Sequence, residues 1–154
     1  SYRTSKTIIH YRLSNGTVKA DFFEDEASQA LATSTYGEIY LLDSLSQKYF
    51  VIGGVQTCNT CRVSLAFTLQ LDTNSIIIEL IALYDGRYYD LDIFDYNIDL
   101  MEFIFEYFAA DNDDSLYGDD NEKKGLKHRL KSKFKFISGK FVEIEKCEFW
   151  EKEK

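Results

Sequence analysis

Apolar and polar residues alternate along most of the chain with a period of two, the pattern of β-strands that turn one face to a core. The clearest run is Val63–Leu71, where five apolar residues alternate with small or polar ones. This pattern predicts strands at Glu38–Ser44, Lys48–Ile52 and Arg62–Leu71.

The first of three turn signals is Asn15-Gly16, a pair that suits a two-residue type I′ hairpin because both positions need positive φ. Folding the chain there sets Leu13 opposite Val18. The same register pairs Tyr11 with Ala20, Ile9 with Phe22, Arg12 with Lys19 and His10 with Asp21.

The second signal is Asp85-Gly86, which predicts that Ile76–Tyr84 folds onto Arg87–Phe94. This register places Glu79 opposite Asp92, with Asp90 opposite Ile81 on the same face. Like charges that face each other on a sheet are unfavourable unless a cation, a basic side chain or a raised pKa relieves them.

The third signal is Ser138-Gly139. A three-residue loop centred on Gly139 predicts apolar pairs on one face and ion pairs on the other, which favours this register over its neighbours. The predicted pairs are Phe136 with Val142, Phe134 with Ile144, Lys135 with Glu143 and Lys133 with Glu145.

The fold class that follows is mainly β: about ten strands in an antiparallel meander that closes as a barrel or a sandwich, with at most one or two short helices. Asp99 and Glu102 resemble a helix capping box, but the alternation in Leu100–Phe108 favours a strand. A short helix is expected at Ala27–Leu31. The length of 154 residues fits one domain, residues 1–154.

The net charge of −8 argues against a nucleic-acid partner, which needs a cationic surface. Five basic residues do alternate on one predicted strand face, but the sequence favours their use in protecting an exposed or edge strand from aggregation. They are Lys127, Arg129, Lys131, Lys133 and Lys135. No apolar run is long enough for a membrane helix, so membrane insertion is not expected.

Cys58-Asn59-Thr60-Cys61 is the most specific short motif. A loop disulfide or two reduced thiols is the first interpretation, and zinc the second, with Cys147 as a further candidate ligand. A redox pair ranks third, because a strand follows the motif and the chain has no proline. No cofactor is expected, and we predict that no metal is bound.

Two acidic sets are weaker candidates. Asp95, Asn97, Asp99 and Glu106 have the spacing of EF-hand calcium ligands, but Leu100 replaces the glycine of the sixth position. The loop Asp111–Glu122 is rich in aspartate and is expected to be solvated.

The expected function is a non-enzymatic binding module for an unknown protein or small ligand. One form of it is an inhibitor or immunity-type protein that neutralises a basic partner. The alternative is a small hydrolase that uses Glu79, Asp90 and Asp92 as acid and base. The close cysteine pair, the absent initiator Met and the aromatic-rich β composition favour an extracytoplasmic location over a cytoplasmic one.

Overall fold

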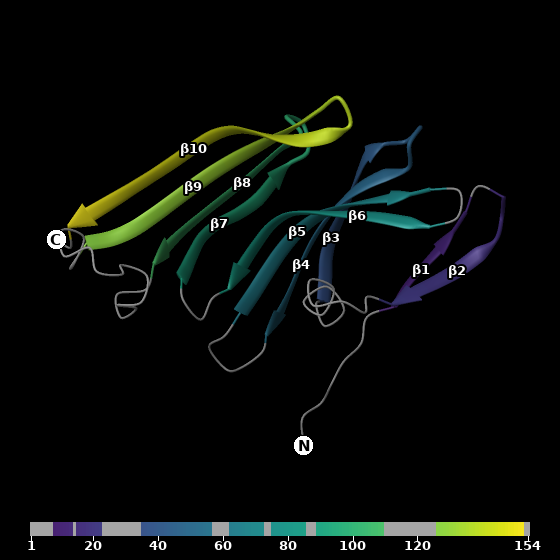
Figure 1. The fold of residues 1–154 in the computed structure, drawn as a ribbon, viewed down its shortest axis with the longest axis horizontal. Helices are drawn as coiled ribbons and strands as arrows, with labels where there is room; N and C mark the ends of the chain where they lie inside the picture. The colour runs from purple at the N-terminus through teal and green to yellow at the C-terminus, as the bar shows by residue number, and fades with distance from the viewer. Residues whose placement is uncertain are drawn as a thin grey trace, which may run out of the picture. The chain divides into compact units, whose positions relative to one another are not determined.

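The fold was analysed in a computed structural model, which describes residues 8–13, 15–22, 35–56, 62–72, 75–85, 89–109 and 126–152. Over these residues the chain forms ten strands and no helix (Figure 1). The strands are β1 (Ile8–Arg12), β2 (Val18–Phe22), β3 (Thr35–Asp43), β4 (Lys48–Gln56), β5 (Arg62–Leu71), β6 (Ile76–Asp85), β7 (Tyr89–Asn97), β8 (Glu102–Ala109), β9 (Leu126–Ile137) and β10 (Lys140–Lys152).

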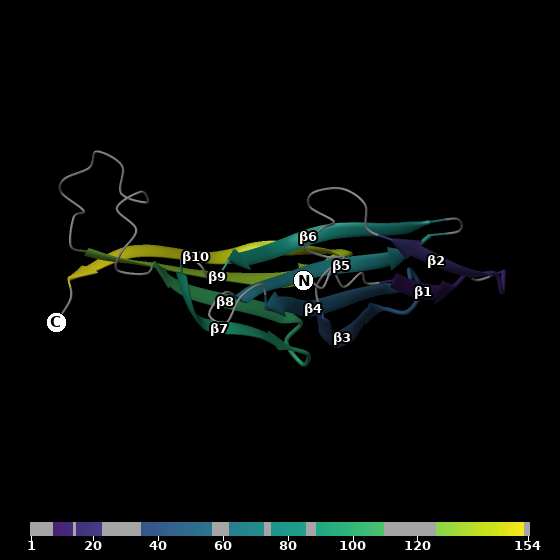
Figure 2. The same cartoon turned by 90° about the horizontal axis from the view of Figure 1, so that it is seen from below.

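The strands form a two-stranded ribbon and two four-stranded sheets. The ribbon is β1-β2, and the sheets have the orders β3-β4-β5-β6 and β7-β8-β9-β10, so neighbours in space are also neighbours in sequence (Figures 1 and 2). The prediction of an antiparallel, all-β meander is therefore confirmed, while neither sheet closes into a barrel. The expected helix at Ala27–Leu31 lies outside the described residues.

The chain divides into two compact units, residues 1–84 and 85–154, and each is described by itself. The first unit holds β1 to β6, apart from Asp85 at the end of β6, and the second holds all of β7 to β10. The predicted hairpin across Asp85-Gly86 is not formed among the described residues, because β6 and β7 are outer strands of different sheets.

The β1-β2 hairpin forms where Asn15-Gly16 predicted it, but its register differs by one residue. Tyr11 pairs with Lys19 and Arg12 with Val18. The amide of Leu13 donates to the Thr17 carbonyl at 2.9 Å, so three residues lie in the turn instead of two. Gly16 has φ +85° and donates to the Leu13 carbonyl, the arrangement of a three-residue loop with a glycine bulge.

The β9-β10 hairpin also differs from its prediction, but here the turn is one residue shorter than predicted. Ser138 (φ +50°) and Gly139 (φ +85°) form a two-residue turn, and Lys140 pairs with Ile137. The register then shifts between Glu143 and Glu145. Beyond that β-bulge the observed pairing of Glu145 with Lys133 is the predicted one, whereas nearer the turn the predicted pairs are wrong by one residue.

A hydrophobic cluster of the first unit lies on one face of the β3–β6 sheet. Val51, Leu65, Phe67 and Leu69 are buried there, and Leu65 and Phe67 are almost wholly inaccessible. They alternate along β4 and β5 as the sequence pattern requires. Tyr49, Leu71, Ile76 and Ile78 pack against this cluster.

The β7–β10 sheet has one aromatic face and one charged face. On β8, Phe103, Phe105 and Tyr107 point to the aromatic face, while Glu102 and Glu106 lie on the other. The aromatic side chains stack in a row, with ring centroids 6.2 Å apart between Phe105 and Tyr107. Phe103, which is fully buried, lies next to Phe105 in this row, with ring centroids 6.0 Å apart.

Candidate functional site

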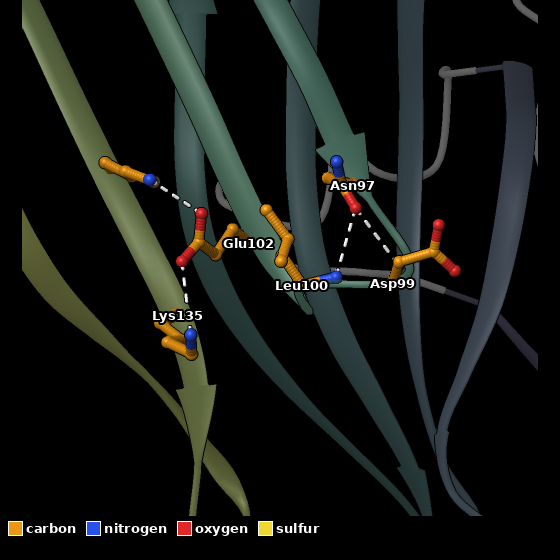
Figure 3. A network of polar contacts seen from close by, with 6 residues as sticks. Asn97, Asp99, Leu100, Glu102 and Lys135 are labelled. Carbon is orange, nitrogen blue, oxygen red and sulfur yellow. Dashed lines mark hydrogen bonds and ion pairs between the residues drawn. The ribbon is translucent and has the colours of Figure 1, made fainter.

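The charged face of the β7–β10 sheet holds the densest set of ion pairs that the described residues show. Glu102 on β8 is bound by two lysines of the neighbouring β9: Lys133 Nζ lies 2.6 Å from one carboxylate oxygen, and Lys135 Nζ lies 3.2 Å from the other (Figure 3). The Glu102 side chain is 9% exposed. The hydrogen bond from Lys133, with that from Lys135, holds the pKa of Glu102 below its ordinary value of 4.5 against the opposing effect of burial.

A second buried carboxylate lies on the same face four residues further along β8. Glu106 forms an ion pair with Arg129 of β9. The guanidinium of Arg129 also lies over the ring of Phe108, 4.3 Å from its centroid. All three ion pairs join β8 to β9, the two inner strands of the sheet.

The row of basic residues on β9 therefore has a different role from the one its sequence favours. β9 is an inner strand, flanked by β8 and β10, so the expectation of an exposed or edge strand is wrong. Arg129, Lys133 and Lys135 are matched by glutamates of β8. These three basic side chains are already engaged in ion pairs within the sheet, which argues against their use in contacting the phosphates of a nucleic acid.

The calcium candidates are not brought together. Asn97 ends β7, and its side-chain oxygen accepts hydrogen bonds from the amides of Asp99 and Leu100, both at 3.0 Å (Figure 3). Glu106 is engaged with Arg129, and Asp95 is exposed on β7 opposite Ile104. No group of three metal-ligating side chains occurs within the described ranges.

Leu100–Phe108 is a strand over most of its length, as favoured from its alternation. Asp99 and Leu100 belong to the turn between β7 and β8, and Met101 takes a positive φ of +52° there. The helix that the Asp99 and Glu102 spacing resembles is absent from this part of the described chain. Glu102 instead begins β8, where it meets the two lysines.

A polar and aromatic cluster lies on the other face of the sheet, at the end away from the β9-β10 turn. His128 Nε2 lies 2.8 Å from a carboxylate oxygen of Glu148, and its ring stacks on Trp150 with centroids 4.3 Å apart. Tyr107 meets His128 edge to face. Because Trp150 and His128 are directly cross-strand partners, this cluster joins the far ends of β9 and β10.

The outer strand β10 exposes an acidic segment, which we call the β10 edge and define as Val142–Glu148. All seven residues are exposed, and they comprise three glutamates, one lysine, two aliphatic residues and Cys147. Glu143 accepts a hydrogen bond from the buried Ser132 hydroxyl at 2.9 Å. In the sheet order nothing follows β10, so no described strand pairs with its outer side.

The three predicted catalytic carboxylates do not share a hairpin. Glu79 is exposed on β6 and lies 3.8 Å from Lys48 Nζ of β4. Asp90 and Asp92 belong to β7, in the other sheet. The cross-strand repulsion that suggested a catalytic pair is therefore not present between Glu79 and Asp92 in either sheet.

The cysteine candidates fall in two places. Cys58 and Cys61 lie between β4 and β5 in the sequence, outside the described residues, so the predicted loop stays a prediction. Cys147 is exposed on β10 and takes no part in a disulfide among the residues that the structure covers. Its Sγ lies 3.9 Å from Glu145 Oε1.

Comparison of the chain with family models, with curated proteins and with solved structures finds no match. In the described part of the chain, no helix is long and apolar enough to cross a membrane.

Sequence reasoning missed Glu102 and Glu106 as partners of the basic residues on β9. Both lie on regular strands, so the alternation was visible, but the pairing of β8 with β9 joins residues separated by the long segment 110–125. A search for two glutamates spaced by four residues, opposite a row of alternating basic residues, would have found Glu102 and Glu106.

Proposed function

We propose that this chain is a non-enzymatic binding module whose partner is a basic protein. The observation that carries the proposal is the β10 edge, an outer strand with three exposed glutamates against one lysine. The chain as a whole carries a net charge of −8, so its long-range field attracts cations and basic surfaces.

The distribution of the other charges supports this assignment. The basic residues Arg129, Lys133 and Lys135 are paired with Glu102 and Glu106 within the sheet. The net negative charge of the chain favours association with a basic partner.

The test is affinity capture from the native lysate with the whole chain as bait, at low and at high salt. The proposal expects one captured protein with a basic isoelectric point, released as salt rises because exposed charge pairs are screened. Identification by mass spectrometry and reconstitution with the purified partner complete the test. A partner that is acidic, or one held equally well at high salt, would contradict charge complementarity.

The hydrolase alternative is not supported by a comparable observation. It needs Glu79 close to Asp90 or Asp92, and the hairpin expected to bring them together is not formed. Glu79 is engaged by Lys48 in its own sheet.

Two finer expectations stay predictions beside this proposal. One is that the β-sheets pack as a sandwich or close as a barrel, which small-angle scattering and an experimental structure would test. The other is an extracytoplasmic location, for which an oxidised Cys58–Cys61 pair in protein isolated from its source would count in favour and reduced thiols would count against.

A further inference from the structure

We propose that two copies of this chain associate through β6, with the two strands paired antiparallel about a twofold axis at Leu80. The inference goes beyond the proposed function and does not depend on it, because β6 and the β10 edge belong to different sheets. The occupant of the outer side of β6 is a second copy of the same strand.

β6 is an outer strand with an apolar sequence. It follows β5 in the sheet order, and no described strand pairs with its other side. Between Ile76 and Tyr84 it holds one charged residue, Glu79. Proteins commonly protect an outer strand with lysine or proline, and β6 contains neither. A long apolar strand of this kind offers its outward backbone donors and acceptors to a second extended chain.

β6 exposes aliphatic side chains on both of its faces. Leu80 is 47% exposed on the face that also holds Ile78, which packs against the hydrophobic cluster. Ile77 and Leu83 are 50% and 55% exposed on the opposite face. Pairing with another strand would bring each of these side chains into contact with a cross-strand neighbour.

The one charged side chain within this stretch is paired inside its own sheet. Glu79 lies 3.8 Å from Lys48 Nζ of β4. Two copies of this chain repel each other at long range, because each carries a net charge of −8. A stretch whose single carboxylate already faces a lysine adds little to that repulsion when two copies meet there.

The other outer strand of the same sheet, β3, is a shorter apolar surface. Its uncharged stretch is the four residues Ile39–Leu42, which lie between the carboxylates of Glu38 and Asp43. Ile39 and Leu41 are exposed, but both point to one face of the strand. β3 therefore serves as the comparison in the experiment below.

The exposed aliphatic residues of β6 are placed symmetrically about Leu80. Ile77 and Leu83 lie three residues to either side of it. A twofold axis perpendicular to the sheet at Leu80 sets Ile77 of each copy opposite Leu83 of the other, and Leu80 opposite itself. Because residues that face each other in an antiparallel pair point to the same side of the sheet, all three meet an aliphatic partner. This self-complementarity selects a second copy as the occupant.

The position of Glu79 favours this register over its neighbours. With the axis at Leu80, Glu79 faces Ile81 of the second copy. An axis one residue earlier would set the two copies of Glu79 opposite each other, which is unfavourable. An axis one residue later would set Glu79 opposite Leu83 and take Ile77 out of the aliphatic pairs. A contact that uses the same strand of both copies closes on itself, so the assembly stops at two chains.

The experiment measures the mass of the whole chain by sedimentation velocity over a range of concentrations. We expect the mass to rise from that of one chain and to level at that of two. Hydrogen exchange at low and high concentration is expected to slow at alternate amides of β6, because only every second amide of an outer strand points outward. Exchange at the amides of β3 is expected to stay unchanged.

Complementary charges test the register. Ile77→Lys and Leu83→Glu, each alone, place a charge against an aliphatic residue at two symmetric positions, and each is expected to weaken association about two- to thirtyfold. When the two variants are mixed, the introduced lysine meets the introduced glutamate of the other chain. The unmodified Ile77 and Leu83 then keep their own contact, so association is expected to recover in the mixture.

Ile39→Lys is the matched control, because it places a lysine at an exposed aliphatic position of the other outer strand. It is expected to leave association unchanged. Circular dichroism of each variant checks that the sheets are retained, and the exchange data on the unmodified chain test the contact without any substitution.

A chain that stays single at every concentration would overturn the inference. Association that is lost in Ile39→Lys and kept in the β6 variants would assign the contact to β3, and a mass that rises beyond two chains would contradict the twofold closure. Weakened association in both β6 variants without recovery in their mixture would overturn the register about Leu80. None of these outcomes decides whether a basic partner exists, which the capture experiment tests separately.

Discussion

At the scale of single residues, Glu102 is the side chain whose surroundings depart most from those its sequence suggests. The Asp99–Glu102 spacing resembles a helix cap, yet Glu102 lies in a strand between Lys133 and Lys135. A carboxylate so nearly buried requires compensation by basic groups, and those groups come from a strand more than 20 residues away in sequence.

Because the pKa of Glu102 is lowered in the folded state, its ionised form stabilises the fold at pH values above the ordinary value of 4.5. That stabilisation is lost as the pH falls from about 4.5 through the lower folded-state pKa. Glu102→Gln is expected to reduce the free energy of unfolding near neutral pH, with the difference from the unmodified chain narrowing in acid.

Urea denaturation at a series of pH values measures this difference. Lys135→Met is the matched control, because it removes one of the two lysines and leaves the carboxylate in place. Lys135→Met is expected to reduce only in part the loss of unfolding free energy as the pH falls. Parallel pH profiles for the unmodified chain and Glu102→Gln would show that the ion pairs do not set the pH dependence.

Ser138 is a second residue with a specific conformational demand, since its φ of +50° is unfavourable for most side chains. Ser138→Asn is expected to raise the free energy of unfolding by about 0.5–1 kcal/mol, because asparagine tolerates this region and completes an Asn-Gly turn. Ser138→Val, which is β-branched, is expected to lower it. Thermal and urea melts of both variants test this, and equal stability of the two would contradict it.

At the scale of elements, the sequence located the strands better than it aligned them. Alternation placed Arg62–Leu71 with both ends correct, because one face of that strand is fully apolar and the other is small or polar. Both hairpins with a confirmed turn were predicted with the wrong register next to the turn. An Asn-Gly or Ser-Gly pair fits either a two- or a three-residue loop, and side-chain pairing alone did not choose between them.

Where β4 pairs with β5, the backbone of Gly54 lies close to that of Val63, and the sequence does not reveal this contact. A Cβ at Gly54 would lie 2.7 Å from the Val63 carbonyl oxygen. Gly54→Ala is therefore expected to destabilise the fold by about 1–3 kcal/mol, as strands must separate locally. Gly37→Ala is the control, because a Cβ there meets nothing within 4 Å. Equal urea midpoints for the two variants would contradict the close approach.

At the scale of the whole molecule, the composition predicted one domain while the fold forms two compact units, each with its own four-stranded sheet. Period-two alternation carries no information about which sheet a strand joins. For that reason the Asp85-Gly86 signal predicted a hairpin at the point where the chain passes from one sheet to the other. The candidate carboxylates were grouped by that hairpin, whereas Glu79 belongs to one sheet and Asp90 and Asp92 belong to the other.

The single tryptophan, Trp150, lies in the second unit and makes the single-domain prediction testable. Phe67→Leu alters the buried core of the first unit and is expected to cost about 1–2 kcal/mol. If the chain unfolds as one cooperative domain, the urea midpoints from tryptophan fluorescence and from far-ultraviolet circular dichroism both shift.

Phe103→Leu, in the second unit, is the control that shifts the fluorescence midpoint in either case. A Phe67→Leu variant with an unchanged fluorescence transition would show that the two units unfold independently, and the single-domain prediction would then be wrong.

The bulge between Glu143 and Glu145 has a consequence for how this hairpin tolerates changes in length. The turn is one residue shorter than a three-residue loop and β10 holds one unpaired residue, Ile144, so Glu145 still meets Lys133. Deletion of Ile144 alone would therefore remove the bulge and leave every pair from Glu145 to Lys152 in place, among them the stacked His128 and Trp150. In a lineage of such chains, we expect the bulge residue to be gained or lost without a matching change in the length of the turn.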